Sequence, residues 1–431
     1  MNNESKEYES YAYSYPHKLA YRLFAEPKSL SETWKHEDVS NMFMYIHIPY
    51  CEMRCGFCNL LTIANPKSGK QSYIDTVIRE LEIYKNTLKD IQIEEYAIGG
   101  GTPTFLHEDD LEKLFSAINK ITNNHLKTII GSVECSPKTV NSTKLSILKK
   151  YGVTRLSMGI QSWLESETRS LGRPQSPVIV EEAITKIKEY NFDVLNLDLI
   201  YGIKNQTSQT FLYSIDRTIN YQPEEIFLYP LYIREQTGLG KKQIEYNDNR
   251  MELYKIGRDY LLENGYQQIS MRCFRKKNTK LKESNYNATL HNTIGIGAGA
   301  RSYTSNRNYS TPFAVKMTSI RSIIENYSKQ TNKNLGLIKY GIVLSEKEKR
   351  IRFLLKSLIE GGQLNVNDYQ VKFATNPFDD FALLREFAIS NWIHEKSGEW
   401  KLTSLGMQKE DTIGPAFYSN SVKQKMQIEV L

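Results

Sequence analysis

Residues 42–58 read MFMYIHIPYCEMRCGFC and join an apolar run to three closely spaced cysteines. The run at 42–49 is short and rich in β-branched and aromatic residues, so it predicts a buried strand. Directly after it comes a loop that carries Cys51, Cys55 and Cys58. A strand that delivers chemically unusual residues at its carboxyl end is typical of parallel α/β folds.

Apolar runs of the same kind recur along the chain, and segments with helical spacing of apolar residues separate them. The predicted strands span residues 42–49, 95–99, 128–134, 153–160, 194–200 and 226–232. The predicted helices span residues 71–88, 108–121, 142–152, 176–191 and 208–221. Strands that alternate with helices form βαβ units around a parallel sheet. The pattern therefore predicts an α/β fold.

Polar residues and glycines follow five successive strands of this predicted sheet. They are the cysteine loop, the glycines at 99–101, Glu134, Gln161 and Asp198. The carboxyl ends of parallel strands meet at one rim, where ligands collect. We therefore expect these residues to form a single site.

Length and composition narrow the class of protein. The chain has 431 residues, of which 40% are hydrophobic and 24% charged, which excludes collagen-like, disordered and coiled-coil proteins. Five cysteines in this length do not form a secreted disulfide scaffold. The polar N-terminus has no secretory h-region, and there is no stretch of 18 apolar residues. We expect a cytoplasmic protein with no membrane partner.

The formal net charge of +7 is modest, and one local bias stands out. Residues 272–282, RCFRKKNTKLK, hold six basic residues and no acidic one. We interpret this stretch as a solvated loop. An acidic substrate or partner is the alternative, whereas no motif supports nucleic-acid binding.

The alternation fades after residue 310. Residues 345–362 predict an amphipathic helix, and residues 378–413 predict a helix, a turn and a short hairpin. We expect an N-terminal cover segment at 1–40, a core at 41–310 and an α-rich C-terminal domain of winged-helix type at 311–431. For the tyrosine-rich stretch at 11–24, packing on the outside is favoured over a lid across the barrel mouth.

The three cysteines form a C-x3-C-x2-C pattern. Thiolates spaced like this on one loop can hold an iron–sulfur cluster, and three ligands for four irons leave one iron open to a small molecule. The alternatives are three unrelated buried cysteines or a zinc site with His47 as its fourth ligand. A zinc loop is usually completed by a second pair of ligands, and Cys135 and Cys273 are isolated.

The sequence YIHIPYCEMRCGFC resembles the cluster loop of radical S-adenosylmethionine (SAM) enzymes, in the version found in oxygen-independent coproporphyrinogen III oxidases. The resemblance continues through GGGTPT, VECSP, RLSMGIQS, LGR, NLDLIYGI and GIGAGARS, over roughly residues 40–305. It implies a partial (β/α)6 barrel with a smaller, winged-helix-like C-terminal domain. It also implies a [4Fe–4S] cluster held by Cys51, Cys55 and Cys58.

By the same resemblance two SAM molecules bind. The residues implied for the SAM on the cluster are Tyr45, Gly100 and Glu134, and those for the second SAM are Phe57, Gly101, Thr102, Gln161, Arg173 and Asp198. Arg155 and Ser157 are further candidates. The glycines at 99–101 would let the backbone approach a ligand closely, and Glu134 could accept both hydroxyls of a ribose. Salt bridges at Glu134, Arg173 and Asp198, and plain packing of Phe57, are the structural alternatives.

Two departures from the family bear on function. Heme chaperones of this branch carry an HNxxYW-type motif before the GIGAGA strand, and this chain keeps only Asn285 of it, with His291 displaced. The oxidases often carry another cysteine after the cluster loop, where this chain has Asn59 and Leu60.

Three functions follow from the resemblance. The first is a radical SAM oxidoreductase that decarboxylates propionate side chains of a tetrapyrrole-like substrate. The second is a class C radical SAM methylase that uses the second SAM as carbon donor, and the third is a heme-binding, chaperone-like protein. We expect a small-molecule substrate, an electron donor such as flavodoxin or ferredoxin, and a monomer.

Overall fold

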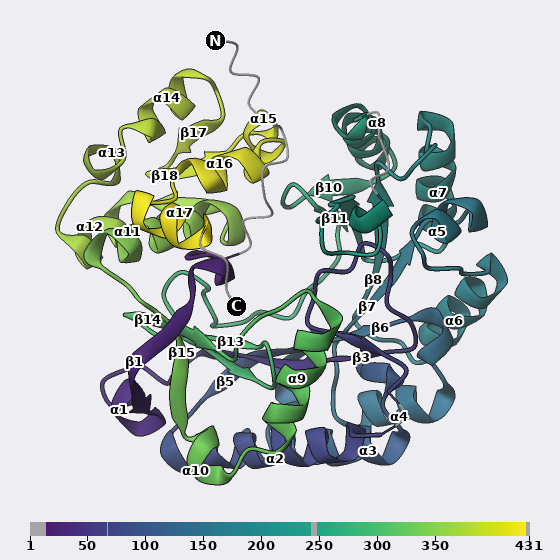
Figure 1. The fold of residues 1–431 in the computed structure, drawn as a ribbon. Helices are drawn as coiled ribbons and strands as arrows, with labels where there is room; N and C mark the ends of the chain where they lie inside the picture. The colour runs from purple at the N-terminus through teal and green to yellow at the C-terminus, as the bar shows by residue number, and fades with distance from the viewer. Residues whose placement is uncertain (1–13, 67, 243–247, 428–431) are drawn as a thin grey trace.

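The computed structural model describes residues 14–66, 68–242 and 248–427. Six parallel strands form its centre (Figure 1). They are β2 (Met42–Ile48), β5 (Ile93–Gly100), β6 (Ile130–Cys135), β7 (Arg155–Gln161), β8 (Val194–Tyr201) and β9 (Glu225–Pro230). All six predicted strands are confirmed, with each end within two residues of the prediction.

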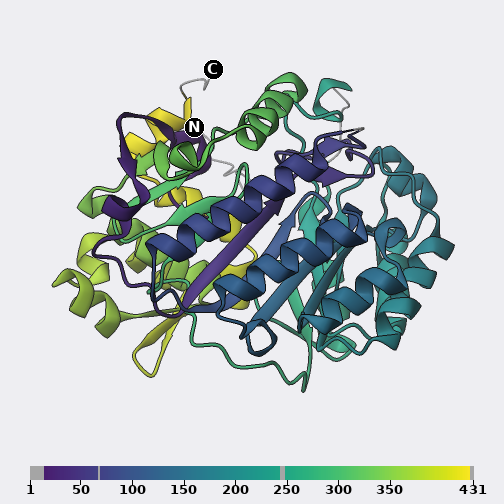
Figure 2. The same ribbon diagram turned by 90° about the horizontal axis from the view of Figure 1, so that it is seen from below.

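Helices cover the outer face of these strands, as Figure 2 shows for the blue helices that cross the sheet. The five predicted helices are α2 (Lys70–Thr87), α3 (Glu108–Ile121), α4 (Ser142–Lys150), α6 (Pro177–Glu189) and α7 (Ser208–Asn220). Two more, α5 (Glu165–Ser170) and α8 (Arg250–Glu263), complete this layer. In α3, Leu111, Leu114 and Ile118 are fully buried, because their spacing puts them on one helix face.

Further strands extend the sheet at both edges, where β12 pairs with β2 in parallel and all the other pairs are antiparallel. Beside β2 the order is β12 (Thr293–Ile296), β13 (Arg301–Tyr303), β14 (Arg307–Ser310), β15 (Leu337–Val343) and β1 (Arg22–Ser29). Beside β9 the order is β11 (Cys273–Lys276) and β10 (Tyr266–Gln268). Since β1 and β10 do not pair with each other within the described ranges, the curved sheet is a partial barrel. The sheet thus includes β1, which precedes residues 41–310 in the sequence, and β15, which follows them.

The C-terminal part combines helices with a small sheet. Helix α11 (Glu346–Leu355) runs into a π-helical turn (Lys356–Glu360), and α12 (Val366–Phe373) and α14 (Leu383–Ile389) follow. Strands β16 (Gln363–Asn365), β18 (Glu399–Leu402) and β17 (Ile393–Lys396) form the sheet. The predicted amphipathic helix, helix and hairpin are confirmed, in a winged-helix-like arrangement.

The N-terminal residues 14–29 run between the barrel and the C-terminal part. The turn η1 (Lys18–Ala20) precedes β1, which pairs with β15. Tyr15 and Tyr21 are buried in the apolar core of the C-terminal part. Residues 1–13 of the expected cover segment lie outside the described residues. No described helix is both long and apolar enough to cross a membrane.

The interpretation of residues 272–282 as a solvated loop is wrong for its first part, which forms β11. Arg272 is only 4% exposed and lies 2.6 Å from Asp411, 139 residues further along. Glu410 accepts a hydrogen bond from the Met271 amide at 2.7 Å. Both acids open helix α16 (Glu410–Ala416), so this ion cluster attaches the C-terminal part to the β10–β11 edge.

We predict that Asp411→Ala lowers the free energy of unfolding by about 3–5 kcal/mol, because it leaves the buried Arg272 charge without its closest carboxylate. Denaturant unfolding followed by intrinsic fluorescence measures this. The control is Asp379→Ala, which removes an exposed pair with Arg385 and should have no measurable effect. Equal effects of the two variants would show that the ion cluster does not support the docking.

Candidate functional site

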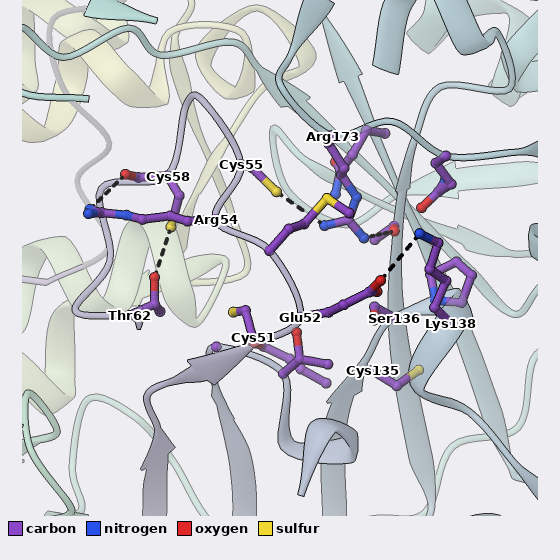
Figure 3. Close-up of a pocket in the computed structure, with 18 of the residues that line it drawn as sticks. Cys51, Glu52, Arg54, Cys55, Cys58, Thr62, Cys135, Ser136, Lys138 and Arg173 are labelled. Atoms are coloured by element: carbon purple, nitrogen blue, oxygen red, sulfur yellow. Dashed lines mark hydrogen bonds and ion pairs between the residues drawn. The ribbon is translucent and has the colours of Figure 1, made fainter. Parts of the chain in front are cut away.

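A pocket of about 180 Å³ lies at the carboxyl ends of the parallel strands. Figure 3 shows the cysteine loop on one side of it and the β6 end on the other. It is lined by eleven of the twelve predicted site residues: Cys51, Cys55, Phe57, Cys58, Gly100, Gly101, Thr102, Glu134, Gln161, Arg173 and Asp198. Tyr45 is not among the lining residues; its hydroxyl lies 3.5 Å from His47 Nδ1.

Short backbone pairings hold the ends of the cysteine loop together. Strand β3 (Tyr50–Cys51) pairs in parallel with β4 (Ile63–Ala64), and the Asn65 amide donates to the Cys51 carbonyl at 2.8 Å. Arg54 crosses the loop and donates to the carbonyls of Cys58 and Val315 at 3.3 and 3.2 Å. These bonds fix the loop that carries the three thiols.

The three thiols are free and partly buried. Arg173 Nη1 lies 3.4 Å from Cys55 Sγ, and Thr62 Oγ1 lies 3.5 Å from Cys58 Sγ. Burial raises the pKa of Cys51 to about 12, against a hydrogen bond from Thr102 that lowers it. Because thiolate is the form that binds metal, the loop requires a positively charged group to deprotonate all three.

His47 is a structural histidine in this fold. It is 4% exposed, and its Nε2 donates to the Leu61 carbonyl at 2.9 Å. Burial lowers its pKa to about 4, so the imidazole is neutral. No three His, Cys, Asp or Glu side chains in the described part converge on one metal ion. The zinc interpretation therefore lacks its fourth ligand.

The glycines at the end of β5 are required by protein neighbours. A Cβ at Gly99 would lie 2.6 Å from Glu134 Oε1, and one at Gly101 would lie 2.6 Å from the Tyr50 carbonyl oxygen. Gly100 has a φ of +100° and faces the His47 ring. The missing side chains thus make room for protein atoms, and the close approach of this backbone to a ligand stays a prediction. The result is that the Gly100 amide donates to Glu134 Oε2 at 3.0 Å.

Two carboxylates face the pocket from neighbouring strands. Glu134 is open to the pocket but enclosed by protein, and this enclosure raises its pKa to about 7, with a further contribution from the Asp198 charge. Enclosure also raises the pKa of Asp198, against a 2.6 Å hydrogen bond from Asn196. Both acids are therefore held in a site that favours a ligand with hydrogen-bond donors or positive charge.

Arg173 and Gln161 adjoin an irregularity between β7 and β8. The strand register shifts between Gly159 and Gln161, and Gln161 has a left-handed φ of 64°. Bulges of this kind redirect side chains next to functional sites. Arg173 Nη2 donates to the Gly159 carbonyl at 2.8 Å, whereas its buried Nε has no partner within the described ranges. A ligand with acceptor oxygens would satisfy this nitrogen.

Comparison with known proteins agrees with the geometry. Residues 45–217 match the radical SAM superfamily.

The relatives of this chain carry two kinds of name. The chain is 29% identical over 270 residues to the heme chaperone HemW of Bacillus subtilis, covering 60% of this chain and 70% of that protein. It is 23% identical over 382 residues to the oxygen-independent coproporphyrinogen III oxidase of Helicobacter pylori, covering 84% and 82%. The solved structure of Escherichia coli coproporphyrinogen III oxidase (HemN) superimposes with a TM-score of 0.79 at 20% identity, covering 95% of this chain and 97% of that one. This confirms the fold, including the C-terminal part.

The radical SAM superfamily implies a [4Fe–4S] cluster and SAM, and the residues that line the pocket fit both groups. The donor set is three thiols on one loop, and the cysteines of a cluster bind different irons rather than one ion. The unpartnered Arg173 Nε and the two enclosed carboxylates suit a ligand that has both a carboxylate and an amino group, as SAM does.

The pocket also contains residues that sequence reasoning missed. Lys138 and Glu52 form a 3.2 Å ion pair across it, from the segment after β6 to the cysteine loop. Their signal in the sequence is their position: Glu52 directly follows Cys51, and Lys138 directly follows the VECSP motif that contains Glu134. Asn196, which holds Asp198, was missed as well.

We predict that Gly100→Ala destabilises the domain more than Gly69→Ala. Both glycines have a left-handed φ, of +100° and +91°, but a Cβ at Gly69 meets nothing within 4 Å whereas one at Gly100 meets His47. Gly69→Ala should cost about 1–2 kcal/mol from backbone strain alone, and Gly100→Ala roughly 1–3 kcal/mol more from overpacking. Thermal unfolding of both variants compares them, and equal losses would contradict the packing argument.

Proposed function

We propose that the protein is a radical SAM oxidoreductase that resembles oxygen-independent coproporphyrinogen III oxidase and removes a hydrogen atom from a tetrapyrrole-like organic substrate. The observation that carries this proposal is the single pocket in which the cysteine loop meets Glu134, Arg173 and Asp198. The relatives named as oxidases, which align over 84% of the chain, support it.

In this proposal the pocket residues divide into three groups. Cys51, Cys55 and Cys58 hold the [4Fe–4S] cluster. Tyr45, Gly100 and Glu134 contact the SAM on the cluster, and Phe57, Gly101, Thr102, Gln161, Arg173 and Asp198 surround a second SAM. The short distance from Arg173 to Cys55 supports a placement of both ligands against the cysteine loop.

When bound, the cluster and SAM supply a carbon-centred radical that can remove hydrogen from an unactivated carbon. In oxidative decarboxylation the hydrogen atom leaves the β-carbon of a propionate side chain, carbon dioxide leaves its carboxylate, and one electron passes to an acceptor. A vinyl group remains. The chain's own residues bind and orient both partners, and the enclosing loop and strand ends exclude water from the pocket.

The heme-chaperone alternative depends on a motif that this chain lacks, and the structure describes what stands in its place. The exposed Asn285 donates to Glu94 at 3.5 Å, and His291 Nδ1 accepts a hydrogen bond from the Asn287 amide at 2.9 Å. Neither residue lines the pocket. The complete pocket therefore favours an enzyme.

The proposal includes partners and a compartment. An external one-electron donor such as flavodoxin or ferredoxin reduces the cluster, and the protein acts as a monomer in the cytoplasm. We also propose that residues 1–40 cover the core at 41–310 and that residues 311–431 form the C-terminal domain.

We predict that anaerobic reconstitution gives about four irons per chain and that Cys55→Ala loses most of this iron. The matched control is Cys273→Ala, since Cys273 is buried outside the pocket. Iron and sulfide analysis of both variants is the measurement. Unchanged iron in Cys55→Ala would overturn the cluster assignment.

We predict that the reconstituted protein, given SAM, dithionite and coproporphyrinogen III, forms 5′-deoxyadenosine together with vinyl products. Mass spectrometry distinguishes the outcomes. S-adenosylhomocysteine and a methylated product would contradict decarboxylation and favour methyl transfer. Tight heme binding without any 5′-deoxyadenosine would contradict an enzymatic role.

A further inference from the structure

A continuous row of polar side chains crosses the inner face of the sheet. The strand register pairs Glu134 with Ser157, Ser157 with Asn196, Asn196 with Glu225 and Glu225 with Arg275. Residues that lie directly opposite on neighbouring strands point to the same face. The row therefore leads from the candidate SAM site on β6 to the β11 edge of the sheet.

At the far end of this row, one carboxylate holds two guanidinium groups. Arg155 Nε donates to Glu225 Oε2 at 2.9 Å. Arg275 donates to Glu225 Oε1 through Nε and Nη2, at 3.0 and 2.9 Å. Two positive charges on one negative charge leave the group with a net charge of +1, and Glu225 fixes the two guanidinium groups close to each other.

Both guanidinium groups keep donors that face open space. Arg155 Nη1 donates to Ser132, but within the described residues Arg155 Nη2 and Arg275 Nη1 have no hydrogen-bond partner. Both nitrogens are accessible, since neither is among the buried polar atoms that lack a partner. The side chains of Arg155 and Arg275 are each 24% exposed, against 6% for Glu225. On the inner face, this open area faces the interior of the barrel.

Arg155 interacts electrostatically with Glu134 and Asp198, two of the residues that we propose for SAM. Enclosure lowers the pKa of Arg155, but the charges of Glu225 and Asp198 outweigh it, so that the pKa is raised. The Arg155 charge in turn partly offsets the rise in the pKa of Glu134. Arg155 also lies over the Phe227 ring at 5.6 Å, which gives the interior a flat apolar surface beside the positive charge.

We propose that Arg155 and Arg275 bind a carboxylate group of the substrate inside the barrel. Guanidinium donors match a carboxylate geometrically and stay charged at any physiological pH. Glu225 is the positioning residue that keeps the pair together. This inference rests on the proposed function, which it deepens by naming the residues that recognise an acidic substrate.

The test measures binding directly, with coproporphyrin III and its tetramethyl ester as probes. Wild type should bind the free acid at least about tenfold more tightly than the ester, since only the acid offers carboxylates. Arg275→Leu should weaken binding of the acid roughly tenfold to hundredfold and leave the ester unchanged. Arg275→Lys keeps the charge and should lie between. Fluorescence titration of the reconstituted proteins gives the dissociation constants.

The variants are designed to fold. In Arg275→Leu, Glu225 keeps its bond to Arg155, so no enclosed charge is left alone. The control is Arg169→Leu, which removes an arginine that also pairs with a glutamate, Glu165, but whose side chain is 67% exposed. Arg169→Leu should bind both probes as wild type does, and thermal unfolding verifies each variant.

The outcomes separate this inference from the proposed function. Equal binding of the acid by wild type and Arg275→Leu overturns the inference, as does a wild type that does not prefer the acid to the ester. Formation of 5′-deoxyadenosine by wild type tests the function separately. If it forms while Arg275→Leu binds normally, the function stands and the arginine site falls. If it never forms while Arg275→Leu loses binding, the arginine site stands and the radical function falls.

Discussion

Side chains along a β-strand alternate between the two faces of the sheet, and the site of this protein depends on that constraint. In β7, Leu156, Met158 and Ile160 are fully buried under the helices, whereas Arg155 and Ser157 between them face the interior. A shift of one residue would exchange the two sets and put charge into the core. The register shift between β7 and β8 lies at Gly159–Gln161, at the carboxyl end of β7, where Ile160 stays in the core and Gln161 lines the pocket.

The charges of the interior are stable because each has a partner of its own. An enclosed charge costs several kcal/mol unless it is paired or hydrogen-bonded. Glu225 has two arginines, Asp198 has Asn196, and Glu134 has the Gly100 amide. These partners differ in strength. The neutral partners do not offset the effect of enclosure, so the pKa of Glu134 and that of Asp198 are raised. At the other end of the row, the two arginines on Glu225 provide positive charge.

The sequence was sufficient for the parallel strands, which depend on local patterns. It was also sufficient for the gathering of eleven site residues, some of which follow from the rule that strand ends meet and the others from the family resemblance. It was not sufficient where the partner is distant. The basic run at 272–282 is indistinguishable from a solvated loop until Asp411 is brought beside Arg272. Strands β1 and β13–β15 fall outside the regular alternation of strand and helix and were not predicted. A glycine is needed at position 100 because a Cβ there would overlap the ring of His47, and no local sequence pattern reveals this contact. The alternation of the polar Arg155 with the apolar Leu156 was visible in the sequence. Arg275, which shares Glu225 with Arg155, lies in the basic run that was wrongly interpreted as a solvated loop.

The C-terminal part completes the barrel by joining its two open edges. On one side its apolar core takes in Tyr340 and Ile342 of β15, next to the edge strand β1. On the other side, α16 attaches to β10 and β11 through Arg272. A curved sheet whose edges are tied to a common body cannot flatten freely, so the docking through Arg272 keeps Glu225 and its two arginines on a curved inner face. One ion cluster contains Arg272, in the turn before β11, and the other contains Arg275, three residues later on β11. The two clusters thus support the same interior from opposite sides of one strand.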